Sequence, residues 1–118
     1  MKPDRRSGGE RRSAMRYRLL LDLEYEDSSG RHRGTLSDIS EEGCFILGGG
    51  ETRDGEALRI FFPLSAGMKV EFAGWIANHV FEIGFAVRFD DLTSAQKDFI
   101  GNFIEEHKDV RIDPDRKS

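Results

Sequence analysis

The chain has 118 residues, of which 18 are Lys or Arg and 22 are Asp or Glu, and this length favours one compact domain over a two-domain enzyme. The charge is uneven: residues 1–18 hold seven basic and two acidic residues, a charge of +5, whereas the remaining residues hold 11 basic and 20 acidic residues, a charge of −9. A basic leader on an acidic body argues against nucleic-acid binding over the whole surface and points to a local anion site.

The N-terminal part of the chain predicts a flexible arm followed by a strand. Residues 1–16 are polar and contain Gly8 and Gly9, so we expect them to be mobile when nothing is bound. In residues 17–25, large apolar residues alternate with polar ones, which is typical of a strand with one buried face. The apolar positions are Leu19, Leu21, Leu23 and Tyr25, and Leu20 is the exception.

Five further segments read as strands. Residues 31–37 follow turn chemistry at 27–30 and predict a hairpin partner for the first strand. Residues 44–47 and 57–64 predict two more strands, the second ending or lying at an edge because it contains Pro63. The last two strands are expected at 68–77 and 80–89, facing each other across Asn78 and His79.

One helix signal closes the chain. Thr93 with Gln96 three residues later is a capping-box pattern, and an apolar face follows, made of Ala95, Phe99, Ile100, Phe103 and Ile104. Six short strands and one helix favour a mainly β fold, a small six-stranded antiparallel β-barrel over residues 17–107. Residues 108–118 are charged and are expected to form a disordered tail.

Several classes of protein are excluded by what the sequence lacks. There is no apolar run long enough for a membrane span and no signal-peptide core, which favours a cytoplasmic protein without membrane insertion. The single cysteine, Cys44, cannot form an internal disulfide and reads as a small buried hydrophobe. The three histidines are scattered, so a metal site is not expected. An enzyme is not expected either, because the sequence contains no identifiable catalytic nucleophile and no phosphate-binding loop.

Two short motifs carry the functional signal. Arg11-Arg12-Ser13-Ala14-Met15-Arg16 places arginines directly before the first strand, and Asp38-Ile39-Ser40-Glu41-Glu42-Gly43 lies between two strands. Each motif alone is unspecific. Their order, the 21 residues between Arg16 and Asp38, and the surrounding strand pattern make the combination informative. With the strand at 83–89 and the terminal helix, the chain resembles the PilZ domain, a bacterial receptor for cyclic di-GMP, over roughly residues 11–107.

The resemblance implies a set of ligand contacts. Arg12 and Arg16 would grip phosphate and guanine, Asp38 and Ser40 would hold a guanine edge, and Gly43 would let the backbone approach the ligand. Arg11 would go with the binding of a stacked pair of ligand molecules. Trp75 would be a stacking platform for a base.

The chemistry of these residues fits such a ligand. Cyclic di-GMP is a dianion with two purine faces, and a guanidinium can bond phosphate or the Hoogsteen edge of guanine in a fork while stacking on a base. A carboxylate such as Asp38 can accept hydrogen bonds from guanine N1 and N2, and a hydroxyl such as Ser40 can donate or accept.

Structural readings stand beside these functional ones. Without the second motif, the arginines would indicate a solvent-exposed N-terminal segment that binds no ligand. Asp38 and Ser40 would also suit a strand-ending turn in which side chains cap backbone groups, and both roles can hold at once. Trp75 is more often a core residue than a ligand platform, because large aromatics on strands normally bury.

The leading hypothesis is a non-enzymatic cyclic di-GMP receptor whose arm closes over the ligand and alters the surface offered to a partner protein. Family outputs include the motility, pilus and exopolysaccharide machineries, and nothing in the sequence chooses among them. One alternative is a PilZ-like adaptor that docks a partner without binding nucleotide. Another is a small RNA-binding β-barrel, which the acidic body disfavours, and DNA is not an expected partner.

Overall fold

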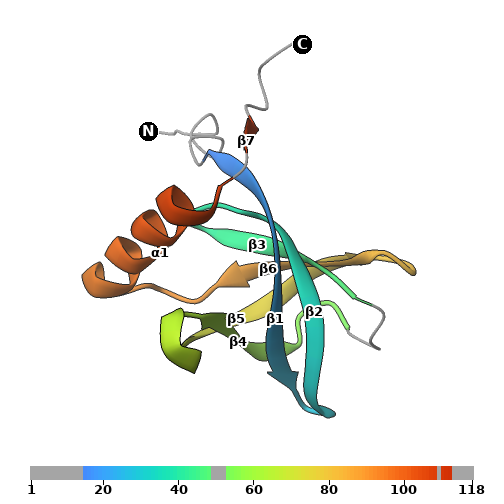
Figure 1. The fold of residues 1–118 in the computed structure, drawn as a ribbon. Coiled ribbons are helices and arrows are strands. Elements are labelled where there is room, and N and C mark those ends of the chain that lie inside the picture. The colour runs from blue at the N-terminus through green and yellow to red at the C-terminus, as the bar shows by residue number, and fades with distance from the viewer. Residues whose placement is uncertain (1–14, 49–52, 109, 113–118) are drawn as a thin grey trace, which may run out of the picture.

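The computed structural model describes residues 15–48, 53–108 and 110–112 of the chain (Figure 1). Strands dominate these ranges, with one helix and a single 3₁₀ turn at Ser65–Gly67. The elements in chain order are β1 (Arg16–Asp27), β2 (Gly30–Ile39), β3 (Gly43–Leu47), β4 (Ala57–Pro63), β5 (Lys69–Val80), β6 (Gly84–Phe89), α1 (Ser94–His107) and β7 (Val110–Ile112).

Six of the strands close into an antiparallel barrel. The order around the sheet is β2-β3-β6-β5-β4-β1, and β1 pairs again with β2, which closes the ring. Helix α1 packs beside one end of the barrel (Figure 1). The predicted six-stranded antiparallel β-barrel with a C-terminal helix is therefore confirmed. Closure pairs the strand edges that would otherwise be open to other chains.

Alternation along β1 shows how the sequence selects its buried face. Leu19 and Leu23 are buried, whereas Leu20 is 64% exposed. Leu21 is only half-buried and packs against the core. The period-two pattern therefore predicts the strand correctly but overstates burial at one position.

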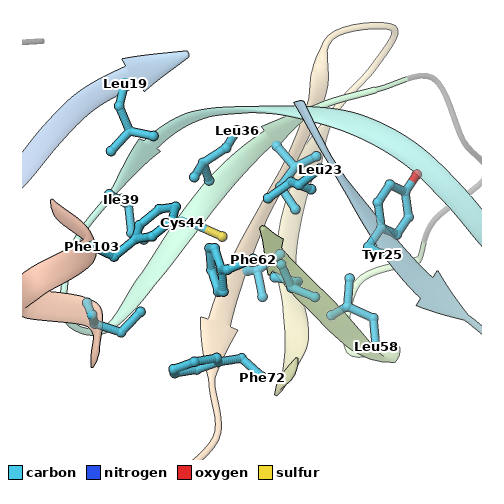
Figure 2. Close-up of a cluster of buried hydrophobic side chains, with 14 of the residues drawn as sticks. Leu19, Leu23, Tyr25, Leu36, Ile39, Cys44, Leu58, Phe62, Phe72 and Phe103 are labelled. Carbon is cyan, nitrogen blue, oxygen red and sulfur yellow. The ribbon is translucent and has the colours of Figure 1, made fainter. Parts of the chain in front are cut away.

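The barrel is filled by one apolar core that mixes aliphatic and aromatic side chains (Figure 2). Phe62 meets the rings of Phe72 and Phe103 edge-on, with centroids 5.3 Å and 5.2 Å apart. Each such pair contributes about 0.5–1.5 kcal/mol beyond the burial of its area. Phe103 belongs to α1, so this cluster fixes the helix on the barrel.

Helix α1 begins with the predicted capping box. The backbone amide of Gln96 donates to the Thr93 hydroxyl at 3.1 Å, and the backbone amide of Thr93 donates to the side-chain oxygen of Gln96 at 2.9 Å. Phe103 is buried as expected. Ala95, expected on the same face, is exposed because it lies in the first turn, ahead of the buried positions that begin at Ile100.

The connection between β5 and β6 differs from the prediction. Asn78 and His79 were expected to form the turn, but β5 continues to Val80 and the turn occupies residues 81–83. A register shift between Ile76 and Asn78 lets the strand continue past these polar residues. His79 is held there by Asp54, whose Oδ1 lies 2.9 Å from its Nδ1.

The two ends of the fold also differ from the prediction. Arg16, placed by sequence in the arm, is the first residue of β1. Residues 108–118 were expected to be disordered, but Val110–Ile112 forms β7, which pairs antiparallel with residues 16–18 of β1. Residues 1–14 of the arm expected at 1–16, and residues 109 and 113–118 of the expected tail, lie outside the described residues.

Candidate functional site

The two sequence motifs meet on the outer surface of the barrel. In the pairing of β1 with β2, Arg18 lies opposite Asp38, so Arg16 and Asp38 are diagonal neighbours on one face. Nη2 of Arg16 donates to Oδ2 of Asp38 at 2.9 Å. The Arg16 side chain is 52% exposed and that of Asp38 17% exposed. An arginine and a carboxylate 22 positions apart in sequence are thus brought into contact by strand register.

Ser40 and Gly43 build the turn between β2 and β3. The Ser40 amide donates to the Gly43 carbonyl at 2.8 Å, and the Glu42 amide donates to the Ser40 hydroxyl at 3.1 Å. Ser40 is buried. A Cβ added at Gly43 would collide with the carbonyl oxygen of Val87 on β6, so glycine is needed for close approach of the strands. The capped-turn reading of this motif is confirmed for Ser40.

Trp75 lies on the outside of the barrel and not in its core. Its neighbours Phe72 and Ile76 on β5 are fully buried, whereas Trp75 is 43% exposed. Alternation on β5 explains this, because the inward positions of the strand are 72, 74 and 76. The expectation that Trp75 is more often a core residue is therefore wrong here.

Strand register connects Trp75 to the motif turn. Gly43 on β3 lies opposite Arg88 on β6, and Arg88 lies opposite Trp75 on β5. The three residues form one cross-strand row. Arg88 was not singled out by the sequence, although the inward positions Phe85 and Val87 on β6 place it on the outer face.

An open groove of about 370 Å³ lies beside the row. Four carboxylates and two cations contribute to its lining, which consists of Glu41, Glu42, Arg88, Phe89, Asp90, Asp91, Leu92 and Lys97. Nη1 of Arg88 lies 3.5 Å from Oε1 of Glu42. The groove therefore carries a net negative lining, to which Arg88 contributes while it lies opposite Trp75 in the sheet.

Other candidate chemistry is absent from the described ranges. Cys44 is buried, and burial raises the pKa of its thiol, with the charge of Asp38 as a smaller cause. In residues 15–48, 53–108 and 110–112, no group of three or more His, Cys, Asp or Glu side chains is placed to hold a metal ion. Within the same ranges no helix is both long enough and apolar enough to cross a membrane.

Of the seven expected site residues, the structure places five. Arg16 and Asp38 are in contact, Ser40 and Gly43 form the adjoining turn, and Trp75 is linked to that turn by strand register. Arg11 and Arg12 lie outside the described residues.

The sequence model of the PilZ domain family matches residues 10–106, which span both motifs, the barrel and nearly all of α1. The chain belongs to the PilZ domain family. No curated protein matches this PilZ chain significantly by sequence.

Solved structures show the same fold at low sequence identity. The PilZ domain of YcgR from Escherichia coli, solved with c-di-GMP, has a TM-score of 0.70 at 13% identity, covering 82% of this chain and 91% of that one. The inhibitor of motility MotI/DgrA from Bacillus subtilis has a TM-score of 0.65 at 16% identity over 82% of this chain. MrkH from K. pneumonia, solved as a c-di-GMP complex, has a TM-score of 0.61 at 13% identity over 87% of this chain. This chain spans about half the length of the last two proteins, 50% and 51% respectively.

Proposed function

We propose that this PilZ domain is a non-enzymatic receptor for cyclic di-GMP that works in the cytoplasm, with Arg12, Arg16, Asp38 and Ser40 as ligand contacts. The observation that carries the proposal is the ion pair between Arg16 and Asp38 at 2.9 Å, because it joins the arginine motif and the Asp-x-Ser-x-x-Gly motif at one place on the barrel. Two of the similar structures support the ligand, since the PilZ domain of YcgR and MrkH were each solved with c-di-GMP.

Charge chemistry supports an anionic ligand at this place. The Arg16 guanidinium is half exposed, and only its Nη2 is engaged by Asp38 at 2.9 Å. Arginine has five N–H donors, so it can keep Asp38 and still bond a phosphate in a fork. Each charge-assisted hydrogen bond contributes about 1.5–3 kcal/mol, whereas a micromolar complex needs about −8 kcal/mol in total. A few arginine contacts are therefore sufficient.

Asp38 is suited to select a guanine. Its carboxylate has about four lone-pair sites, and the described contact with Arg16 uses Oδ2. The remaining sites can accept hydrogen bonds from guanine N1 and N2. Adenine offers no such pair of donors on that edge, so Asp38 would favour guanine.

The proposed contact of Trp75 follows from its position on the outer face of the barrel. We expect Trp75 to provide a platform on which one base stacks, because its indole is partly exposed on the same outer row as Gly43.

We also propose that the arm closes over the ligand through Arg12, which changes the surface offered to a partner protein. Ordering the arm opposes binding by about 1–2 kcal/mol for each residue fixed. Arg11 would add contacts to a second ligand molecule.

A PilZ-like adaptor that docks a partner without binding nucleotide is the alternative. The observation that favours it is that Ser40 and Gly43 have structural roles in the β2–β3 turn that need no ligand. The presence of Ser40 and Gly43 in this turn would then reflect folding alone.

Isothermal titration calorimetry with cyclic di-GMP separates the two functions. We expect micromolar binding by the unmodified chain and at least tenfold weaker binding by Arg12→Ala. The matched control is Arg33→Ala, which removes an exposed arginine from β2 near the opposite end of the strand, paired in register with Glu24. Binding weaker than about 100 μM by the unmodified chain would reject the receptor function and leave the adaptor. The stoichiometry reports whether one or two ligand molecules bind.

A further inference from the structure

Arg88 and Trp75 are directly opposite each other on β6 and β5. Side chains in such cross-strand positions have Cβ atoms about 4.5–5.5 Å apart and project from the same face of the sheet. Both are partly exposed on the outside of the barrel, the Arg88 side chain at 53% and Trp75 at 43%. A planar group resting on the Trp75 indole would therefore have its edge within reach of the Arg88 guanidinium.

The contact that Arg88 makes leaves most of its donors available. Its Nη1 lies 3.5 Å from Oε1 of Glu42, a long and partly exposed ion pair that contributes little to stability. The pair holds the guanidinium near the motif turn without saturating it. Glu42 itself is fixed by its backbone, since its amide donates to Ser40 and its carbonyl accepts from the Phe89 amide at 2.9 Å.

We propose that Arg88 is a specificity-determining residue of the site, which donates in a fork to O6 and N7 of the guanine that stacks on Trp75. This inference rests on the proposed function. Arginine with guanine O6 and N7 is a geometrically matched bidentate pair. Adenine presents an amino donor in place of O6, which the guanidinium cannot approach favourably. Asp38 and Arg88 would then read opposite edges of guanine bases at two places on the same outer face.

A second role for the same cation has a different signature. If Arg88 bound a phosphate, its contribution would not depend on the base, and any change in the base edge would leave that contribution intact. The two roles can be separated with a ligand whose base edge is altered but whose phosphates are unchanged.

The test is a thermodynamic cycle in which Arg88 in the protein and N7 in the ligand are changed separately and together. Calorimetry compares cyclic di-GMP with its bis-7-deaza analogue, which replaces N7 by C–H, on the unmodified chain, Arg88→Ala and Arg88→Lys. We expect the unmodified chain to bind the analogue about 10- to 100-fold more weakly, the size of one lost charge-assisted hydrogen bond. In Arg88→Ala, the affinity ratio between cyclic di-GMP and the analogue should be at least fivefold smaller than in the unmodified chain. Arg88→Lys should not restore the ratio, because lysine lacks the fork.

Each other outcome overturns the inference. Equal weakening of both ligands by Arg88→Ala, with rescue by Arg88→Lys, identifies a phosphate contact. Unchanged affinity for both ligands shows that Arg88 does not touch them, while the receptor function still stands. If the unmodified chain binds neither ligand, the proposed function fails and the inference fails with it. Amide NMR spectra of each variant verify that the barrel is intact, and Arg33→Ala is the control for loss of one positive charge.

Discussion

Arg16 Nη2 and Asp38 Oδ2 are 2.9 Å apart, so the residue that begins β1 is tied to the end of β2. An incoming dianion would meet a guanidinium whose charge is already partly balanced. The pair therefore orients Arg16 and lowers the repulsion that a bare Asp38 would exert on phosphate.

The first prediction concerns Asp38→Asn. The amide keeps the size of the side chain but removes its charge and one acceptor, so we expect cyclic di-GMP binding to weaken at least tenfold. Stability should change by less than about 1 kcal/mol, because the pair with Arg16 is partly exposed. Calorimetry and urea unfolding measure the two effects. Asp98→Asn, an exposed carboxylate on α1, is the matched control, and equal effects of both variants on binding would contradict a local role for Asp38.

The second prediction compares two glycines. Gly43→Ala should destabilise the barrel by about 1–3 kcal/mol, because the new methyl group would collide with the Val87 backbone. Gly101→Ala should stabilise the chain by up to about 1 kcal/mol, since Gly101 lies inside α1 and, apart from its chain neighbours and the nearby helix backbone, no atom lies within 4 Å of the added carbon. Urea unfolding of both variants tests the pair. A tolerated Gly43→Ala with unchanged stability would show that the strands can separate at this point.

The third prediction is a pH dependence at Asp27. Desolvation raises the pKa of this carboxyl, but hydrogen bonds from Ser29 and the contact with His32 outweigh it, so the net shift is downward. A carboxyl whose pKa is lower in the folded state stabilises the fold above its unfolded pKa of about 3.9, and this contribution disappears as pH falls through the folded pKa.

Asp27→Asn should therefore be less stable than the unmodified chain at pH 7, and the difference should shrink steadily below about pH 4. Thermal unfolding across this range gives the measurement. Asp98→Asn again controls for removal of an acidic residue. A difference that stays constant down to pH 2 would mean that Asp27 acts through packing and not through its charge.

The fourth prediction uses Trp75 as a reporter. The sequence contains one tryptophan, so tryptophan emission comes from this position alone. If a guanine stacks on the indole, emission should change with cyclic di-GMP concentration and follow the same midpoint as the heat of binding. Heat of binding without any change in emission would place the base elsewhere.

The fifth prediction concerns β7. A chain ending at Lys108 should be less stable by roughly 1–3 kcal/mol, since it loses the backbone pairing of β7 with residues 16–18. Hydrogen exchange should accelerate at Arg16, Tyr17 and Arg18. A chain ending at Ile112 keeps β7 and should behave like the full chain, and equal exchange in the two truncations would show that β7 does not hold the start of β1.

The barrel could be predicted because its signals are local. Alternation in β1 and the capping box at Thr93 each depend on a few neighbouring residues, and both are present in the structure. The turn near Asn78 was misplaced because a register shift interrupts the alternation, and a shift is set by the partner strand. β7 has three residues and no usable periodicity, so its existence depends on the exposed edge of β1.

The site could be predicted only in part. Motif spacing identified Arg16 and Asp38, whose contact depends on the pairing of β1 with β2. Residue type alone favours a core position for Trp75 over the stacking platform that the resemblance implies, because it takes no account of strand parity. The burial of Phe72 and Ile76 on the same strand would have placed it outside. The position of Arg88 opposite Trp75 depends on how β5 pairs with β6, and no single segment of the sequence reveals that pairing.

Arg16 pairs in register with Ile112, so the first and last strand residues of the structure are immediate neighbours (Figure 1). Arg16 and Ile112 therefore lie together at one point of the barrel, close to the contact between Arg16 and Asp38. A domain fused ahead of Arg16 or after Ile112 would begin at the proposed ligand face and not across the barrel from it. Fluorophores attached just outside these two residues would form a proximity sensor for events at that face.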